Sequence, residues 1–222
     1  IIGKEVIVDW AKVQQNRANV TMKLTSGVSA LMKANKIKVL SGEAVFTAPK
    51  TVKVGADTIT ADKIIIAAGS YPIIPGIPGV KESKACIDST GALTLDHVPE
   101  SLVVIGGGVI GIELGSVYAA FGTKVTIIEM LPKLLPLMEG ELTGMVRSQL
   151  EGKGIAIYTE TKVLSVSDTA KGAIVKAESK DGVHEFEAEK VLVCVGRGPA
   201  TASLGLDKAG IAEDHGYIRT NE

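Results

Sequence analysis

Three glycines of the chain, Gly106, Gly108 and Gly111, have the spacing G-x-G-x-x-G and follow the apolar run 102–105. Such a run is typical of a strand that is buried on both faces. The first glycine of this pattern permits a sharp turn, the second lets the backbone approach a pyrophosphate, and the third lets the next helix pack closely on the strand. The N–H groups and the positive dipole end at the start of such a helix attract phosphate. The spacing therefore predicts a dinucleotide site.

Glu129 supports this interpretation because it ends a second apolar segment, residues 124–128. An acid about 20 residues after the glycines is placed to bind ribose hydroxyls. Its carboxylate would repel a 2′-phosphate, and Met130 and Leu131 after it carry no charge, so NAD is favoured over NADP. Lys133 is the one nearby cation that weakens this preference. A glycine-rich turn without a ligand is the alternative interpretation.

The composition excludes several classes of protein. With 222 residues, 45% hydrophobic and 22% charged, the chain is expected to fold into one or two domains. A net charge of −1 and 4% aromatic residues give no reason to expect nucleic acid or an anionic membrane as a partner. A membrane helix over residues 102–122 is disfavoured because Glu113 lies near its centre.

Cysteine and histidine give no chemical motif. Cys86 and Cys194 form neither a C-x-x-C pair nor a zinc pattern, and the three histidines are scattered. We therefore expect no metal site, and no residue of the chain stands out as catalytic.

The first third of the chain predicts a long helix and a small meander. Apolar residues at helical spacing cover 10–34, with Asp9 as the expected N-cap and a sheet as the expected partner. Expected strands follow at residues 37–40, 42–46, 51–54, 57–60 and 62–69. The proline-rich stretch 72–80 cannot be regular structure and is expected to connect two domains.

The remainder predicts an α/β arrangement. A helix is expected at residues 139–152, short strands at 155–158 and 161–167, a hairpin over 173–188, a buried strand at 189–195 and a turn at 196–199. The expected fold class is thus α/β, with a Rossmann-like domain made of a parallel sheet and an antiparallel meander.

Several of these segments together resemble a known family. They are Ala67-Ala68-Gly69-Ser70, residues 89–93, residues 103–115, Glu129, Thr161-Lys162-Val163 and Gly196-Arg197-Gly198-Pro199. In order and spacing they are similar to the two-dinucleotide-binding flavoprotein disulfide reductases over nearly the whole chain, and most closely to the lipoamide dehydrogenase branch. Ala68 departs from the usual threonine of that family, and Gly198 departs from a common arginine.

The resemblance implies two domains, an incomplete FAD-binding domain at residues 1–96 and an NAD-binding domain at 97–222. It implies NAD contacts in the glycine loop and the start of its helix, at Glu129 on the ribose, at Val163 on the adenine and at Gly196 near the nicotinamide. It implies FAD contacts at Ala44, Ala68, Gly69 and Ser70. The loop residues concerned are Gly106, Gly107, Gly108, Val109, Ile110, Gly111, Ile112 and Glu113.

The resemblance also implies what this chain lacks. The family's redox-active C-x-x-x-x-C and its C-terminal dimerisation domain are absent from the sequence, so we expect an interior part of a longer protein. The whole enzyme would oxidise dihydrolipoamide with NAD and would serve the lipoyl domains of a 2-oxo acid dehydrogenase complex. It would form a homodimer only when the C-terminal domain is present. It would work in the cytoplasm or the mitochondrial matrix. An NADH oxidase, a mercuric reductase and a free-standing NAD-binding module are the alternatives.

Overall fold

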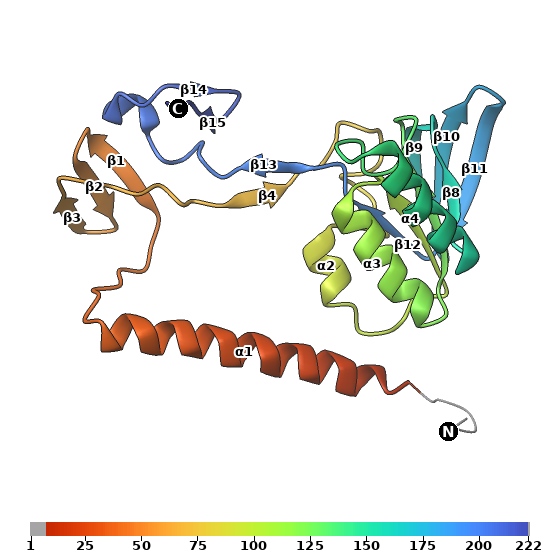
Figure 1. The fold of residues 1–222 in the computed structure, drawn as a ribbon, viewed down its shortest axis with the longest axis horizontal. Helices are drawn as coiled ribbons and strands as arrows, with labels where there is room; N and C mark the ends of the chain where they lie inside the picture. Colours follow the sequence, from red (N-terminus) through yellow and green to blue (C-terminus); the bar gives the residue numbers. More distant parts are fainter. Residues whose placement is uncertain (1–7, 222) are drawn as a thin grey trace. The chain divides into compact units, whose positions relative to one another are not determined.

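A computed structural model describes residues 8–221, which pack as two compact units (Figure 1). Unit 1 comprises residues 1–16 and 72–196, of which the first seven lie outside the described residues. Unit 2 comprises residues 17–71 and 197–222. The compact units thus divide the chain near residues 16, 71 and 196, whereas the sequence places a domain boundary at 96. Residues 72–96 group with unit 1 because they supply an edge strand and a helix to it.

A five-stranded parallel sheet forms the centre of unit 1, in the order β5-β12-β6-β7-β8. Residues 102–105 of β6 are almost completely buried, as their apolar run predicts. The strands are β5 (Cys86–Ile87), β12 (Lys190–Val193), β6 (Ser101–Ile105), β7 (Lys124–Ile128) and β8 (Ala156–Tyr158).

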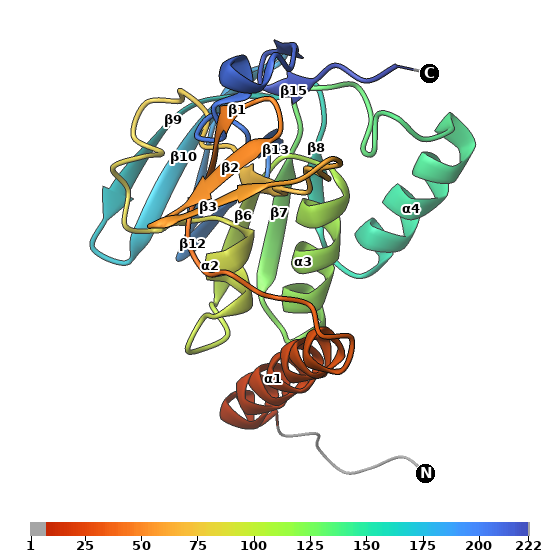
Figure 2. The ribbon, with the colours of Figure 1, turned by 90° about the vertical axis from the view of Figure 1, so that its left-hand side faces the viewer.

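Helices cover one face of this sheet and an antiparallel sheet covers the other (Figure 2). The helices are α2 (Ser89–Leu93), α3 (Val109–Ala120) and α4 (Gly140–Gly152), and the antiparallel strands are β9 (Lys162–Thr169), β10 (Gly172–Ser179) and β11 (Gly182–Ala188). Side chains of β6 alternate between the two faces. Leu102 and Val104 join the core on the helical side, whereas Val103 and Ile105 join the core on the other side. The predicted parallel sheet with a meander is therefore confirmed.

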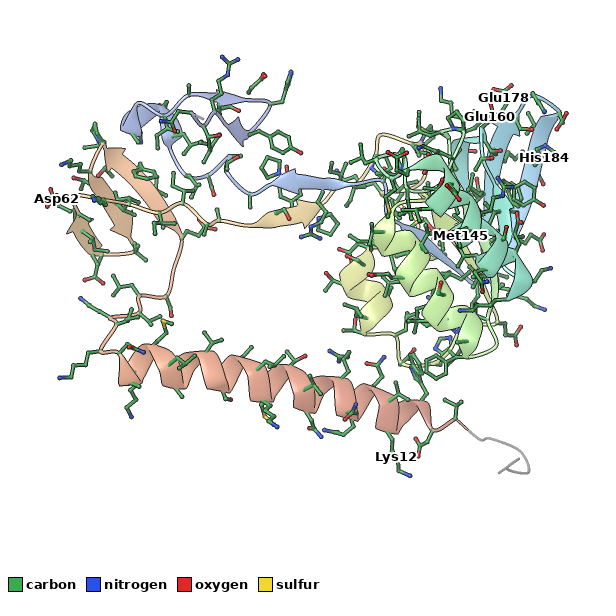
Figure 3. The ribbon with its side chains drawn as sticks, in the orientation of Figure 1. Lys12, Asp62, Met145, Glu160, Glu178 and His184 are labelled. Carbon is green, nitrogen blue, oxygen red and sulfur yellow. The ribbon has the colours of Figure 1, made fainter. Side chains whose placement is uncertain are left out.

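Helix α1 (Trp10–Ala34) has the predicted bounds, and Asp9 caps it by accepting a hydrogen bond from the Lys12 N–H at 3.1 Å. Lys12 itself, labelled in Figure 3, also pairs with Asp9. None of the helix residues is buried, so the expectation that α1 covers a sheet is wrong. Among the described residues, no helix is long and apolar enough to cross a membrane.

Unit 2 contains the predicted meander as β1 (Ala44–Ala48), β2 (Thr51–Val54) and β3 (Asp57–Thr60). A short 3-10 helix, η1 (Leu206–Ala209), packs on β1. The remaining strands are the pair β4 (Ser70–Pro72) and β13 (Arg197–Pro199) and the pair β14 (Glu213–Asp214) and β15 (Tyr217–Ile218).

Three predicted elements are wrong. Residues 37–40 and 62–69 form no strand, and Ile65 is 92% exposed. A strand needs a neighbour to bind its N–H and C=O groups, and no described strand forms a ladder with either stretch. Residues 197–199 were expected in a turn but form β13, because β4 lies beside them.

Candidate functional site

The candidate site lies at the carboxyl edge of the parallel sheet of unit 1. From β6 the chain passes through α3 to β7 and through α4 to β8 on one side, while β12 occupies the other side of β6. The strand order therefore reverses between β6 and β12, and ligands of open α/β sheets bind at the carboxyl ends of strands at such a point. The three glycines directly follow β6, at that position.

Gly106 makes the turn out of β6 with a φ of +112°, which favours glycine. A Cβ atom on it would lie 2.5 Å from the carbonyl oxygen of Cys194, the residue after β12. Gly111 brings α3 onto β6, since a Cβ there would lie 2.4 Å from the Gly106 oxygen. The turn and packing roles predicted for these two glycines are confirmed.

Gly108 differs from its neighbours because no atom lies within 4 Å of the position of its missing Cβ. It is the N-cap of α3, and no side chain caps that end of the helix. The first turn of α3 also holds no acidic residue that would repel an anion. Open space, unused N–H groups and the helix dipole are what a pyrophosphate requires.

Glu129 follows β7 and is buried, with 7% of its surface exposed. One carboxylate oxygen accepts the Gly107 N–H at 2.6 Å, and the other accepts the Leu131 N–H at 2.8 Å. The predicted ribose acid thus lies directly against the glycine loop. Lys133, the cation that qualified the preference for NAD, donates to the Met138 carbonyl at 2.7 Å.

The other residues proposed for NAD have different surroundings. Glu113 is exposed on α3, and the described residues give it no ion pair. Val163 belongs to the core and is 8% exposed, so any contact with adenine would use its backbone. Gly196 is exposed, and its carbonyl accepts the Ile73 N–H at 3.0 Å.

The residues proposed for FAD lie in unit 2, where Ala44, Ala68, Gly69 and Ser70 are all exposed. Arg197 fixes Ser70 there, because its guanidinium donates to the Ser70 hydroxyl at 2.8 Å and to the Ser70 carbonyl at 2.5 Å.

Neither cysteine is suited to thiol chemistry. Burial raises the pKa of the Cys194 thiol to about 12, and burial also raises the pKa of Cys86. A reactive cysteine needs a lowered pKa, since the thiolate is the nucleophile. Within residues 8–221, no three metal-ligating side chains come together.

Sequence reasoning missed two residues of the site, Leu134 and Leu135. Both lie in the segment between β7 and α4, which the sequence presents only as a loop with two prolines. The Leu135 N–H donates to the Gly107 carbonyl at 3.0 Å, and the Leu134 side chain lies against Gly107. The apolar pair itself was the available signal, because two leucines in an exposed loop need a reason to be there.

A family model described as pyridine nucleotide-disulphide oxidoreductase matches residues 1–222. The chain belongs to this family. It is 44% identical over 215 residues to the dihydrolipoyl dehydrogenase of Geobacillus stearothermophilus and 41% identical over 228 residues to that of Bacillus subtilis. These matches cover 95% and 100% of this chain, and 45% and 48% of the relatives. The chain thus spans about half the length of the curated relatives it matches.

Solved structures agree with this assignment. The HOCl-induced flavoprotein disulfide reductase RclA from Escherichia coli superposes with a TM-score of 0.82 at 30% identity, over 94% of this chain and 48% of that one. Its Cu(II) complex gives a TM-score of 0.83. Members of this oxidoreductase family use FAD and a pyridine nucleotide, and the dihydrolipoyl dehydrogenases use FAD and NAD.

Proposed function

We propose that this chain is the NAD-binding portion of a dihydrolipoyl dehydrogenase. The whole enzyme oxidises dihydrolipoamide with NAD, through a redox disulfide and FAD, and it serves the lipoyl domains of a 2-oxo acid dehydrogenase complex. The single observation that carries the proposal is the open Gly108 position at the uncapped start of α3, next to Gly107, whose N–H the Glu129 carboxylate accepts. Identities of 41% and 44% to two dihydrolipoyl dehydrogenases support the choice of substrate class.

The residues of this chain bind and orient NAD in this proposal. The N–H groups at the start of α3 hold the pyrophosphate, and Glu129 accepts the adenosine ribose hydroxyls with the acceptor capacity that its two backbone bonds leave. Glu113, one turn into α3, and Gly196 lie toward the nicotinamide end. The NAD supplies the hydride-accepting chemistry, so the protein's contribution is position and charge.

The flavin wall belongs to unit 2 in this proposal. Exposed backbone at Ala68, Gly69 and Ser70 faces FAD, and Arg197 holds Ser70 in place. Because the chain contains no C-x-x-x-x-C and its two thiols have raised pKa values, this chain alone turns over no dihydrolipoamide.

Calorimetric titration with NADH and NADPH tests the proposal. Placing a 2′-phosphate beside a carboxylate costs several kcal/mol, so NADH should bind at least about tenfold more tightly than NADPH. Glu129→Gln should weaken NADH and reduce the discrimination. Equal binding of the two nucleotides would contradict NAD specificity, and absence of NADH binding would contradict the cradle.

Another flavoprotein of the same group is the second candidate, favoured by the likeness to a flavoprotein disulfide reductase at 30% identity. The higher identity to dihydrolipoyl dehydrogenases makes it the weaker of the two. Both candidates share the NAD cradle, so the titration tests what they have in common.

A further inference from the structure

The segment between β7 and α4, residues 130–138, folds back onto the glycine loop; we term it the buttress loop. Its Leu135 N–H donates to the Gly107 carbonyl at 3.0 Å. On the other side of the same residue, the Gly107 N–H donates to Glu129 at 2.6 Å, and Glu129 also accepts the Leu131 N–H at 2.8 Å. The Gly107 carbonyl is therefore bonded by the buttress loop, and the Gly107 N–H is bonded by Glu129, the residue that precedes this loop.

Leu134 is the apolar anchor of the buttress loop. It is 2% exposed, whereas Leu137 in the same loop is fully exposed. A Cβ atom on Gly107 would lie 2.5 Å from the Cδ2 atom of Leu134, so this methyl group lies directly over the Gly107 α carbon. The same side chain belongs to the core on the helical side of the sheet, together with Ile127 and Leu150. Leu134 thus connects the core of unit 1 to the middle of the glycine loop.

Figure 2 shows the segment between β7 and α4 leaving the sheet at the end where α3 begins. At that end, the N–H groups of α3 can hold a pyrophosphate only if the preceding loop keeps them in position. Gly107 lies between the turn at Gly106 and the N-cap at Gly108. A displacement of Gly107 would therefore move the donors that follow it.

We propose that Leu134 is a positioning residue of the pyrophosphate cradle and holds Gly107 in register from outside the motif. The inference rests on the proposed binding of NAD at residues 106–113. The Leu134 side chain lies against Gly107, so its effect would reach the ligand through the glycine loop. Its contribution is to preorganise the donors rather than to add a contact.

The test compares Leu134→Ala with Leu150→Ala in the full chain. Both leucines are buried in the same core, 2% and 5% exposed, and both substitutions remove the same atoms. Both should lower the Tm. Because misplaced donors bind weakly, only Leu134→Ala should raise the Kd for NADH, by about tenfold or more. Equal effects of the two variants on the Kd, or no effect of Leu134→Ala, would overturn the proposal.

A second measurement does not depend on nucleotide binding. Amide hydrogen exchange of Gly107 should be slow in the wild type, because Glu129 accepts its N–H, and faster in Leu134→Ala than in Leu150→Ala. Leu134→Met, which retains most of the volume, should restore both the exchange rate and the NADH affinity. If Leu134→Ala fails to fold, the milder truncation Leu134→Val takes its place, and an unchanged Kd and exchange rate in Leu134→Val would refute the proposal. If the wild type binds no NADH, that result contradicts the proposed function only. The amide hydrogen-exchange rate of Gly107 in the variants would still decide whether Leu134 holds Gly107 in position.

Discussion

Gly108 and Gly111 both belong to the glycine motif, but only Gly111 lies against other protein atoms. Gly111→Ala would place a methyl group 2.4 Å from the Gly106 oxygen and 2.9 Å from Val104, so it should lower the free energy of unfolding by about 1–3 kcal/mol. Gly108→Ala meets no protein atom and has an extended backbone conformation, so it should cost less than about 1 kcal/mol. NADH binding should nevertheless weaken in Gly108→Ala, because the methyl group would occupy the space that we propose for the pyrophosphate.

Urea denaturation and NADH titration of the two variants check this expectation. A Gly108→Ala variant that binds NADH as the wild type does would show that the pyrophosphate lies elsewhere. A Gly111→Ala variant of unchanged stability would contradict the close approach of α3 to β6.

At the scale of single residues, the sequence predicted the glycines of the motif but missed Leu134, which lies against the motif. The roles of Gly106 and Gly111 follow from local spacing, since turn and helix are contiguous in the chain. Leu134 reaches Gly107 only because β7 runs beside β6 and the chain returns over the loop. A contact made by that return has no periodic signal in the sequence.

At the scale of secondary-structure elements, His97 joins the segment that precedes β6 to the segment that precedes β12. Its Nδ1 lies 2.6 Å from Asp96 and its Nε2 lies 2.5 Å from Glu189, which also accepts the Glu100 N–H at 2.8 Å. Two carboxylate acceptors require both ring nitrogens to carry hydrogen, so the bonds to Glu189 and Asp96 raise the pKa of His97 above its usual 6.5.

Because this pKa is raised on folding, His97 stabilises the protein fully below about pH 6.5, and the contribution is lost as the pH rises through the higher folded value. The side chain is half exposed, so the effect should be under about 1 kcal/mol. Denaturation of the wild type and His97→Gln between about pH 5 and 9 measures it. A difference between the two that does not change with pH would refute this role of His97.

Elements were predicted well where their partners are adjacent in the sequence. The meander 44–60, helix α4 and the hairpin of β10 and β11 follow from periodicity and turn residues, because each finds its neighbour along the chain. Residues 62–69 also have strong strand propensity, but no described strand pairs with them, so propensity alone misled the prediction. In β13 the opposite error occurred. Its residues were predicted as a turn, but they form a strand because β4 pairs with them.

For the molecule as a whole, the two cores belong to one stretch of chain. All the buried residues of both clusters lie between residues 80 and 193, whereas unit 2 buries only a few large apolar side chains, among them Phe46 and Leu206. We therefore expect residues 72–196 to fold alone and to bind NADH within about twofold of the full chain. Calorimetry and circular dichroism check this. An unfolded product, or one without NADH affinity, would show that residues outside the stretch complete the cradle.

The unpaired isoleucines of unit 2 have a practical consequence for the solubility of this chain. Residues 64–68 combine high strand propensity with no charge and no proline, and within them Ile65, which is 92% exposed, and both alanines are open to other molecules. Such segments stack between chains and seed aggregates. Light scattering should therefore rise with protein concentration, and Ile65→Lys should suppress the rise while leaving the NADH affinity of unit 1 unchanged. Preparations of the chain would then be limited by this short segment rather than by the stability of the parallel sheet of unit 1.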